Sequence, residues 1–116
     1  MVNVLVVDDE FEDLKKIKSV LETKGYNITA VTSGARAIEA LAGPEFDIML
    51  IDILMPSLCG YELLKMMEQR KKNKTSLVFL SIMPAKELVG DHSDVFLKKP
   101  FSADALLSAV DKALAK

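Results

Sequence analysis

The chain has 116 residues, 50% of them hydrophobic, and a formal net charge of −2, which favours one compact domain over residues 1–116 and argues against disorder. No window approaches the roughly 20 apolar residues of a membrane span, and the N-terminus lacks a secretory signal, so we expect a cytoplasmic protein without membrane insertion. The single cysteine and single histidine exclude an internal disulfide and a zinc-type cluster, and the slight acidity argues against direct nucleic-acid binding.

The first part of the chain alternates predicted strands and helices. Residues 4–7 are continuously apolar, which is typical of a central parallel strand buried on both faces. The more mixed run at 27–31 fits an edge strand. Apolar side chains at helical spacing predict two crossover helices, one marked by Phe11, Leu14, Ile17 and Leu21 and the next by Ala37, Ile38 and Leu41.

The same alternation continues to the end of the chain. Residues 48–51 and 77–80 are again continuous apolar runs, whereas the short run at 95–97 fits the second edge strand. Ser102 is a candidate N-cap for the last helix, and Asp104 lies in its first turn. Helical spacing marks a third crossover helix by Leu63, Leu64 and Met67, and the last helix by Ala103, Leu106, Leu107, Val110 and Leu114.

Strand and helix alternate five times, which predicts an α/β fold with a five-stranded doubly wound parallel sheet. The flavodoxin-like strand order 2-1-3-4-5 suits five such units with right-handed crossovers. The crossover between the fourth and fifth strands has only residues 82–94, close to the dozen or so that a parallel connection needs. Because Pro84 and Gly90 interrupt that segment, we predict a shortened or missing fourth helix.

Polar residues follow the predicted strands at the edge where ligands bind in such sheets. Asp8 and Asp9 follow the first strand, Asp52 ends the third, Ser81 ends the fourth, and Lys99 follows the fifth. Each has an ordinary explanation when it is taken singly, such as an acidic helix start or a solvated lysine. Together, at the ends of strands in one sheet, they predict a single site.

Three carboxylates at one edge repel one another unless a cation is held between them. Mg²⁺ fits this group, because it prefers oxygen ligands and is commonly bound by one or two carboxylates together with a phosphoryl group. Lys99 supplies a compact positive charge, and Ser81 supplies a hydroxyl that can donate to phosphoryl oxygens. An aspartate between them can act as a nucleophile.

The ordered set of motifs resembles the response-regulator receiver domains, including the single-domain receivers of chemotaxis. The resemblance covers essentially the whole chain, and the set is far more specific than any single motif. It is carried by Val7-Asp8-Asp9-Glu10, by Asp52-Ile53-Leu54-Met55-Pro56 followed by Gly60, by Ser81, and by Lys99-Pro100-Phe101.

The resemblance implies a role for each matching position. Asp52 is then the phospho-acceptor, while Asp9 binds Mg²⁺ directly, Asp8 acts through water, and the backbone carbonyl of Leu54 is a further ligand. Lys99 pairs with the phosphoryl group and is placed by a cis bond to Pro100.

The resemblance also implies how the signal would be transmitted. Ser81 is the hydroxyl that moves toward the new phosphate, and Phe96 takes an inward rotamer or is an ordinary packed aromatic side chain of an edge strand. A sensor histidine kinase or phosphotransfer protein is the implied donor, and a downstream protein is the implied target. The protein is then no conventional enzyme, since it catalyses only its own aspartyl phosphorylation and dephosphorylation.

Two other readings stay open from the sequence. The first is a degenerate receiver that binds proteins without ever taking phosphate. The second is a flavodoxin-like enzyme that binds FMN or a nucleotide, but its phosphate loop should be rich in Gly, Ser and Thr, whereas this chain has Asp8, Asp9 and Glu10 there. Phosphorylation that Asp52→Asn abolishes separates a working receiver from a degenerate one.

Several positions depart from the family pattern. Cys59 stands where many members have aspartate, and we expect it to be neutral. Ile82 follows the switch hydroxyl, where the family often has a small residue, and we predict that it slows phosphorylation by small donors.

We also predict a comparatively long-lived phosphoryl state. Leu54 and Met83 lie two residues beyond Asp52 and Ser81, and neither apolar side chain can orient an attacking water. Loss of label from purified phosphoprotein measures the lifetime, and rapid loss would contradict the prediction.

Overall fold

The computed structural model describes residues 1–43, 45–52, 75–81 and 95–115. Each predicted strand is present and differs from its predicted range by at most one residue at either end. The elements are β1 (Asn3–Val7), α1 (Phe11–Glu22), β2 (Asn27–Val31), α2 (Gly34–Leu41), β3 (Ile48–Asp52), β4 (Ser76–Ser81), β5 (Val95–Lys98) and α5 (Ala103–Leu114).

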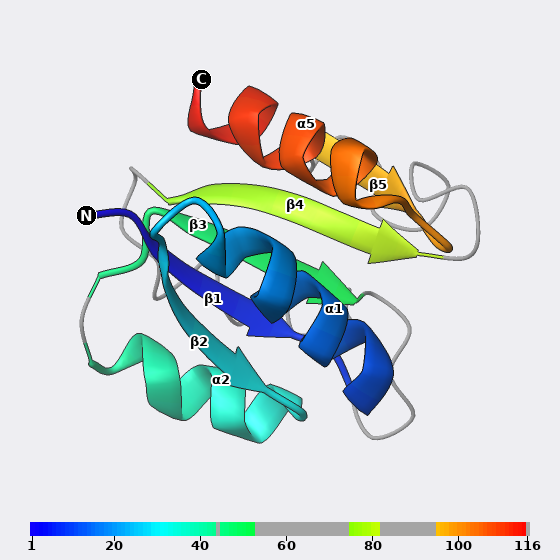
Figure 1. Cartoon of the computed structure of the whole chain (residues 1–116). Helices are drawn as coiled ribbons and strands as arrows, with labels where there is room; N and C mark the ends of the chain where they lie inside the picture. Colours follow the sequence, from blue (N-terminus) through cyan, green and yellow to red (C-terminus); the bar gives the residue numbers. More distant parts are fainter. Residues whose placement is uncertain (44, 53–74, 82–94, 116) are drawn as a thin grey trace.

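The strands form one parallel sheet in the order β2-β1-β3-β4-β5 (Figure 1). The predicted order is therefore confirmed, with β2 and β5 at the edges and the three continuous apolar strands in the middle. Because all the strands are parallel, their carboxyl ends lie along one edge of the sheet.

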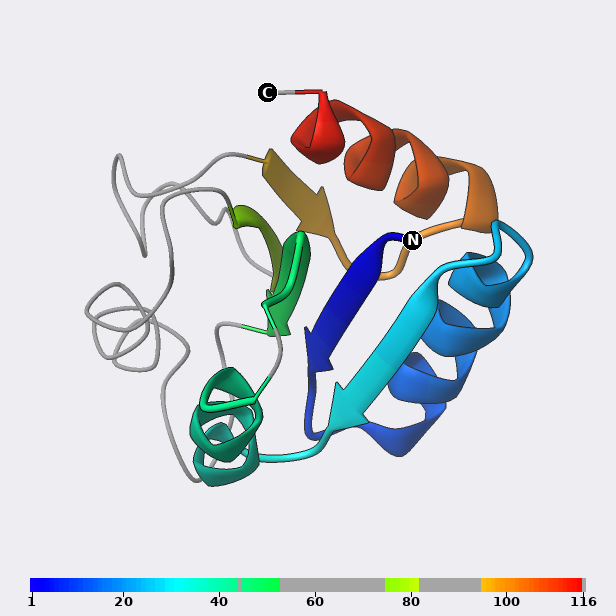
Figure 2. The same ribbon diagram turned by 90° about the vertical axis from the view of Figure 1, so that its left-hand side faces the viewer.

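Helices cover both faces of the sheet, with α1 and α5 on one face and α2 on the other (Figure 2). In β1, Val4 and Val6 pack in the same core cluster as the buried residues of α1 and α5. Leu5 and Val7 pack in the second cluster, which contains Ala37 of α2. Since successive side chains of a strand point to opposite faces, a strand buried on both faces must be apolar at every position.

The apolar stripe of α1 is shorter than the sequence predicts. Leu14, Ile17 and Leu21 are buried, but Phe11 is 65% exposed. Phe11 is the first residue of a helix whose first turn extends beyond the strand ends, so the sheet does not cover it (Figure 1). The centroid of its ring instead lies 5.6 Å from the Nζ of Lys15.

Side-chain caps begin two of the helices. The side chain of Ser102 accepts a hydrogen bond from the N–H of Ala105 at 3.1 Å, which confirms the predicted N-cap of α5. Ser33 caps α2 in the same way through the N–H of Arg36 at 3.2 Å. Each cap satisfies one of the backbone donors that a helix leaves unpaired in its first turn.

Some of the predictions fall on residues that the structure does not describe. These are the third crossover helix, the shortened or missing fourth helix between residues 82 and 94, and the individual positions Leu54, Cys59, Ile82 and Met83. Within the described parts of the chain, no helix has both the length and the apolar composition needed to cross a bilayer.

We predict that Ser102→Ala lowers the free energy of unfolding by about 1 kcal/mol, because it removes the α5 cap. Urea unfolding followed by circular dichroism measures the change. The control is Ser108→Ala, an exposed position inside the same helix, where alanine should leave stability unchanged or raise it slightly. Equal losses in the two variants would contradict a capping role.

Candidate functional site

The predicted site residues of four strands lie at the carboxyl edge of the sheet. Asp8 and Asp9 follow β1 directly, and Asp52 is the last residue of β3. Ser81 is the last residue of β4, and Lys99 follows the last residue of β5. Because β1 pairs with β3 and β3 pairs with β4, residues far apart in sequence lie side by side here.

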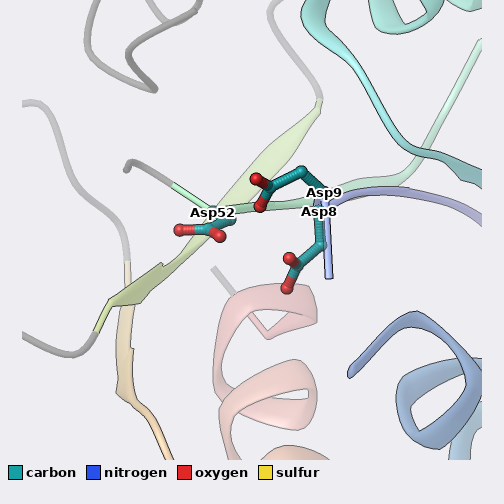
Figure 3. A group of neighbouring side chains, drawn as sticks. All are labelled: Asp8, Asp9 and Asp52. Carbon is teal, nitrogen blue, oxygen red and sulfur yellow. The ribbon is translucent and has the colours of Figure 1, made fainter. Parts of the chain in front are cut away.

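Three aspartates form a compact group of oxygen donors at this edge (Figure 3). Each of Asp8, Asp9 and Asp52 offers a carboxylate oxygen that lies within 4.8 Å of the other two. Asp8 is fully buried and Asp52 nearly so, whereas Asp9 is exposed. Two of the carboxylates are therefore held inside the protein, and the third faces solvent.

Asp8 is fixed through both of its carboxylate oxygens. Its Oδ1 accepts a hydrogen bond from the N–H of Glu10 at 2.9 Å, and its Oδ2 accepts one from the Nζ of Lys99 at 2.8 Å. The N–H of Asp8 donates to the carbonyl of Val31 at 3.2 Å, which ties the turn after β1 to the end of β2. These bonds compensate the burial of this carboxylate.

The ammonium group of Lys99 joins carboxylates from three elements. Its Nζ lies 2.8 Å from Oδ2 of Asp8, 3.2 Å from Oδ2 of Asp52 and 2.8 Å from Oδ2 of Asp13 in α1. An ammonium group has three N–H donors, so these three carboxylates can occupy all of them. Lys99 is thus the common counter-ion of the site.

The backbone around Lys99 is also held in place. Its N–H donates to the carbonyl of Ser81 at 2.8 Å, which continues the pairing of β4 with β5 by one residue. The peptide bond between Lys99 and Pro100 is cis, as the resemblance to receiver domains implies.

The surroundings of Lys99 act on its pKa in both directions. Burial lowers the pKa, while the hydrogen bonds to Asp13 and Asp8 and the negative charges of Asp8 and Asp52 raise it. The combined effect of the carboxylates is larger than that of burial, so the pKa of Lys99 lies above its ordinary value of 10.5. The lysine therefore stays charged in the folded protein throughout the neutral range.

Ser81 is the last residue of β4, next to the Lys99 backbone, and Phe96 lies within β5. Ser81 is buried and is paired in register with Lys98. Phe96 is half-buried, and its ring centroid lies 5.6 Å from that of Phe79, its partner in the sheet register. Phe96 thus packs against an aromatic side chain of the neighbouring strand.

Asp13 is the member of the site that the sequence does not predict. It lies in the first turn of α1, where an acidic residue has an ordinary role beside the helix N-terminus. One feature of the sequence could have indicated this role. Asp13 immediately precedes the buried Leu14, so it lies at the border of the buried face of α1. Its pairing with Lys99 depends on how α1 packs against the segment after β5.

The residues present fit a hard divalent cation. Asp8, Asp9 and Asp52 supply carboxylate oxygens, which Mg²⁺ prefers, and the exposed Asp9 leaves room for the waters that Mg²⁺ commonly keeps. Leu54, whose carbonyl is the further ligand implied by the resemblance, lies outside the described residues.

We expect Lys99→Gln to lower the free energy of unfolding by roughly 3 kcal/mol near pH 7 without divalent cations, since Asp8 and Asp52 would stay buried without their counter-ion. Chemical unfolding in the presence of a chelator measures the loss. Lys98→Gln, at the exposed neighbouring position, is the control and should change stability little. Equal effects of the two substitutions would contradict a central role of Lys99.

The pH dependence of this contribution has a definite sign. The pKa of folded Lys99 lies above 10.5, so its contribution is fully present below that pH and is lost as the pH rises through the folded-state pKa. The free energy of unfolding should therefore differ between wild type and Lys99→Gln by the same amount at about pH 7 and at about pH 9.

Comparisons with known proteins identify the family. The model of the response regulator receiver domain matches residues 4–111. The response regulator SaeR of Staphylococcus aureus is 33% identical over 123 residues, which cover 100% of this chain and 52% of that protein. The chain thus spans about half the length of the curated relatives it matches.

Solved structures agree with this result. The chemotaxis response regulator CheY4 of Vibrio cholerae superposes with a TM-score of 0.86 at 26% identity, covering 98% of this chain and 99% of that one. The response regulator TrrA of Thermotoga maritima, solved in complex with Mg²⁺-BeF, gives a TM-score of 0.86 at 28% identity and covers 98% of this chain and 100% of its own. The chain therefore belongs to the response regulator receiver domains, which act in phosphorelay signalling.

Proposed function

We propose that this receiver accepts a phosphoryl group on Asp52 in a Mg²⁺-dependent reaction and thereby switches a protein-binding surface. The observation that carries the proposal is the placement of the buried Asp52 carboxylate between two other aspartates and Lys99. Receiver domains interact with histidine kinases or phosphotransfer proteins, and we infer that a protein of one of these classes is the donor.

Asp8, Asp9 and Asp52 would hold the metal ion, together with the carbonyl of Leu54. Bound Mg²⁺ would offset negative charge on the transferring group and on the aspartates. In the transfer, the bond between phosphorus and the donor breaks while a bond forms between phosphorus and a carboxylate oxygen of Asp52. The donor atom leaves with the electron pair of the broken bond.

Lys99 and Ser81 are the side chains we assign to the phosphoryl group. The ammonium of Lys99 already donates to Oδ2 of Asp52, so a phosphoryl group on that carboxylate would lie within its reach. It would stabilise the negative charge of the group in a buried setting, where such interactions are strong. The hydroxyl of Ser81, at the end of the strand paired with β3, would donate to a phosphoryl oxygen.

Output would follow from a change of packing near β5. Movement of Ser81 toward the phosphate would open space beside β5, and Phe96 would turn inward from its half-buried position. Phosphorylation would then shift the population between two surfaces, one of which binds a downstream protein. Receiver domains are not conventional enzymes, and we propose that catalysis here is limited to phosphorylation and dephosphorylation of the chain itself, in the cytoplasm.

We predict that incubation with a small acyl phosphate and Mg²⁺ adds the mass of one phosphoryl group to the intact protein. The gain should vanish in Asp52→Asn and with a chelator, and it should persist in Asp111→Asn, an exposed aspartate of α5. Mass spectrometry of the intact chain provides the measurement. If neither a small donor nor a histidine kinase modifies wild type, the degenerate receiver replaces this proposal.

A further inference from the structure

Asp13 pairs with Lys99 from outside the metal-binding group. Its Oδ2 lies 2.8 Å from the Nζ of Lys99, as close as that of Asp8 and closer than that of Asp52. Asp13 belongs to α1 and is not part of the group of oxygens formed by Asp8, Asp9 and Asp52. A metal ion bound by that group would therefore not compete with Lys99 for the carboxylate of Asp13.

A second contact fixes α1 against the same segment. Lys16 donates a hydrogen bond to the carbonyl of Phe101, and its Nζ lies 4.8 Å from the centroid of the Phe101 ring. Asp13 and Lys16 are three residues apart in the helix and so lie on one face. The helix thus contacts residues 99 and 101, on both sides of Pro100.

Lys99 and a divalent cation need the same carboxylates. The ammonium bonds to Asp8 and Asp52, which are also two of the three carboxylates grouped closely enough to bind a metal ion. A metal ion entering this group would repel the ammonium and compete for its acceptors. The ease of metal binding then depends on whether Lys99 has another partner, and Asp13 is such a partner.

We propose that Asp13 is a positioning residue that holds the ammonium of Lys99 from the α1 side and so frees Asp8 and Asp52 for Mg²⁺. The proposal rests on the proposed function of the site, because it concerns the same metal ion. Two effects of Asp13 act in the same direction: it neutralises the lysine that competes with the metal, and it adds a negative charge near the site.

Asp13 would also keep Lys99 in place during the reaction. Once Asp8 and Asp52 turn to the metal, the long lysine side chain would otherwise lose its bonds and swing toward solvent. Its pairing with Asp13 keeps the ammonium beside the strand ends, where a phosphoryl group on Asp52 would meet it. One carboxylate outside the metal group therefore serves both metal binding and phosphoryl recognition.

The test is the Mg²⁺ dissociation constant, measured by amide NMR titration of the whole chain without any phosphodonor. We expect Asp13→Asn to weaken Mg²⁺ binding roughly tenfold, about the effect of losing one hydrogen bond to a charged group. Glu12→Gln removes the same charge from the neighbouring exposed position of the same turn and should weaken binding less than about twofold. Asp13→Glu, which keeps the charge, should recover most of the wild-type affinity.

A double-mutant cycle with Lys99→Gln separates positioning from simple charge. If Asp13 acts through the lysine, then Asp13→Asn in the Lys99→Gln background should weaken binding no more than Glu12→Gln does. A full tenfold loss in that background would overturn the proposal, because the effect would then be independent of Lys99. Equal effects of Asp13→Asn and Glu12→Gln in the wild-type background would overturn it as well.

The failure of this inference can be told apart from failure of the proposed function. If wild type gives no Mg²⁺-dependent amide shifts, both fall. If wild type binds Mg²⁺ but Asp13→Asn binds it equally well, only the role of Asp13 falls. The amide spectrum of each variant reports its fold, and Asp13→Ser replaces Asp13→Asn if the asparagine variant fails to fold.

Discussion

The site depends on one positive charge placed among carboxylates. Lys99 bonds to Asp8 and Asp52, both buried, and to Asp13 on a neighbouring helix. Buried carboxylates are tolerated only when they are paired and hydrogen-bonded, so the lysine makes the arrangement of the others possible. It also raises the cost of separating β1, β3, α1 and the segment after β5, because each contributes a charge to the same cluster.

The order of the strands explains why a lysine fills this position. Asp8 and Asp52 are neighbours because β1 pairs directly with β3. The fifth strand is separated from β3 by β4 and from β1 by one strand more, so the positive charge must extend well away from β5 to meet Asp52 and Asp8. A lysine has the long, flexible side chain that this distance needs, and its compact ammonium can serve several acceptors at once. The proposed Mg²⁺ would add a second cation to the same carboxylates.

The sequence by itself determined the architecture and most of the site. Runs that are apolar at every position can be stable only in strands covered on both faces, which identified β1, β3 and β4 as central. The polar residues that end or directly follow the strands had to share an edge, because parallel strands end on the same side of a sheet. Local pattern and strand topology are therefore sufficient to bring Asp8, Asp9, Asp52 and Lys99 together.

The tertiary structure decided what depends on the packing of one element against another. Phe11 continues the apolar spacing of α1 but is exposed, because the helix begins beyond the strands that would cover it. From its position in the first turn of α1, Asp13 is expected to be a solvated acid. It pairs instead with Lys99, because α1 packs beside the segment that follows β5. Helical spacing specifies which residues share a face, but the neighbour of that face is set by three-dimensional packing, so such contacts become visible only in the folded protein.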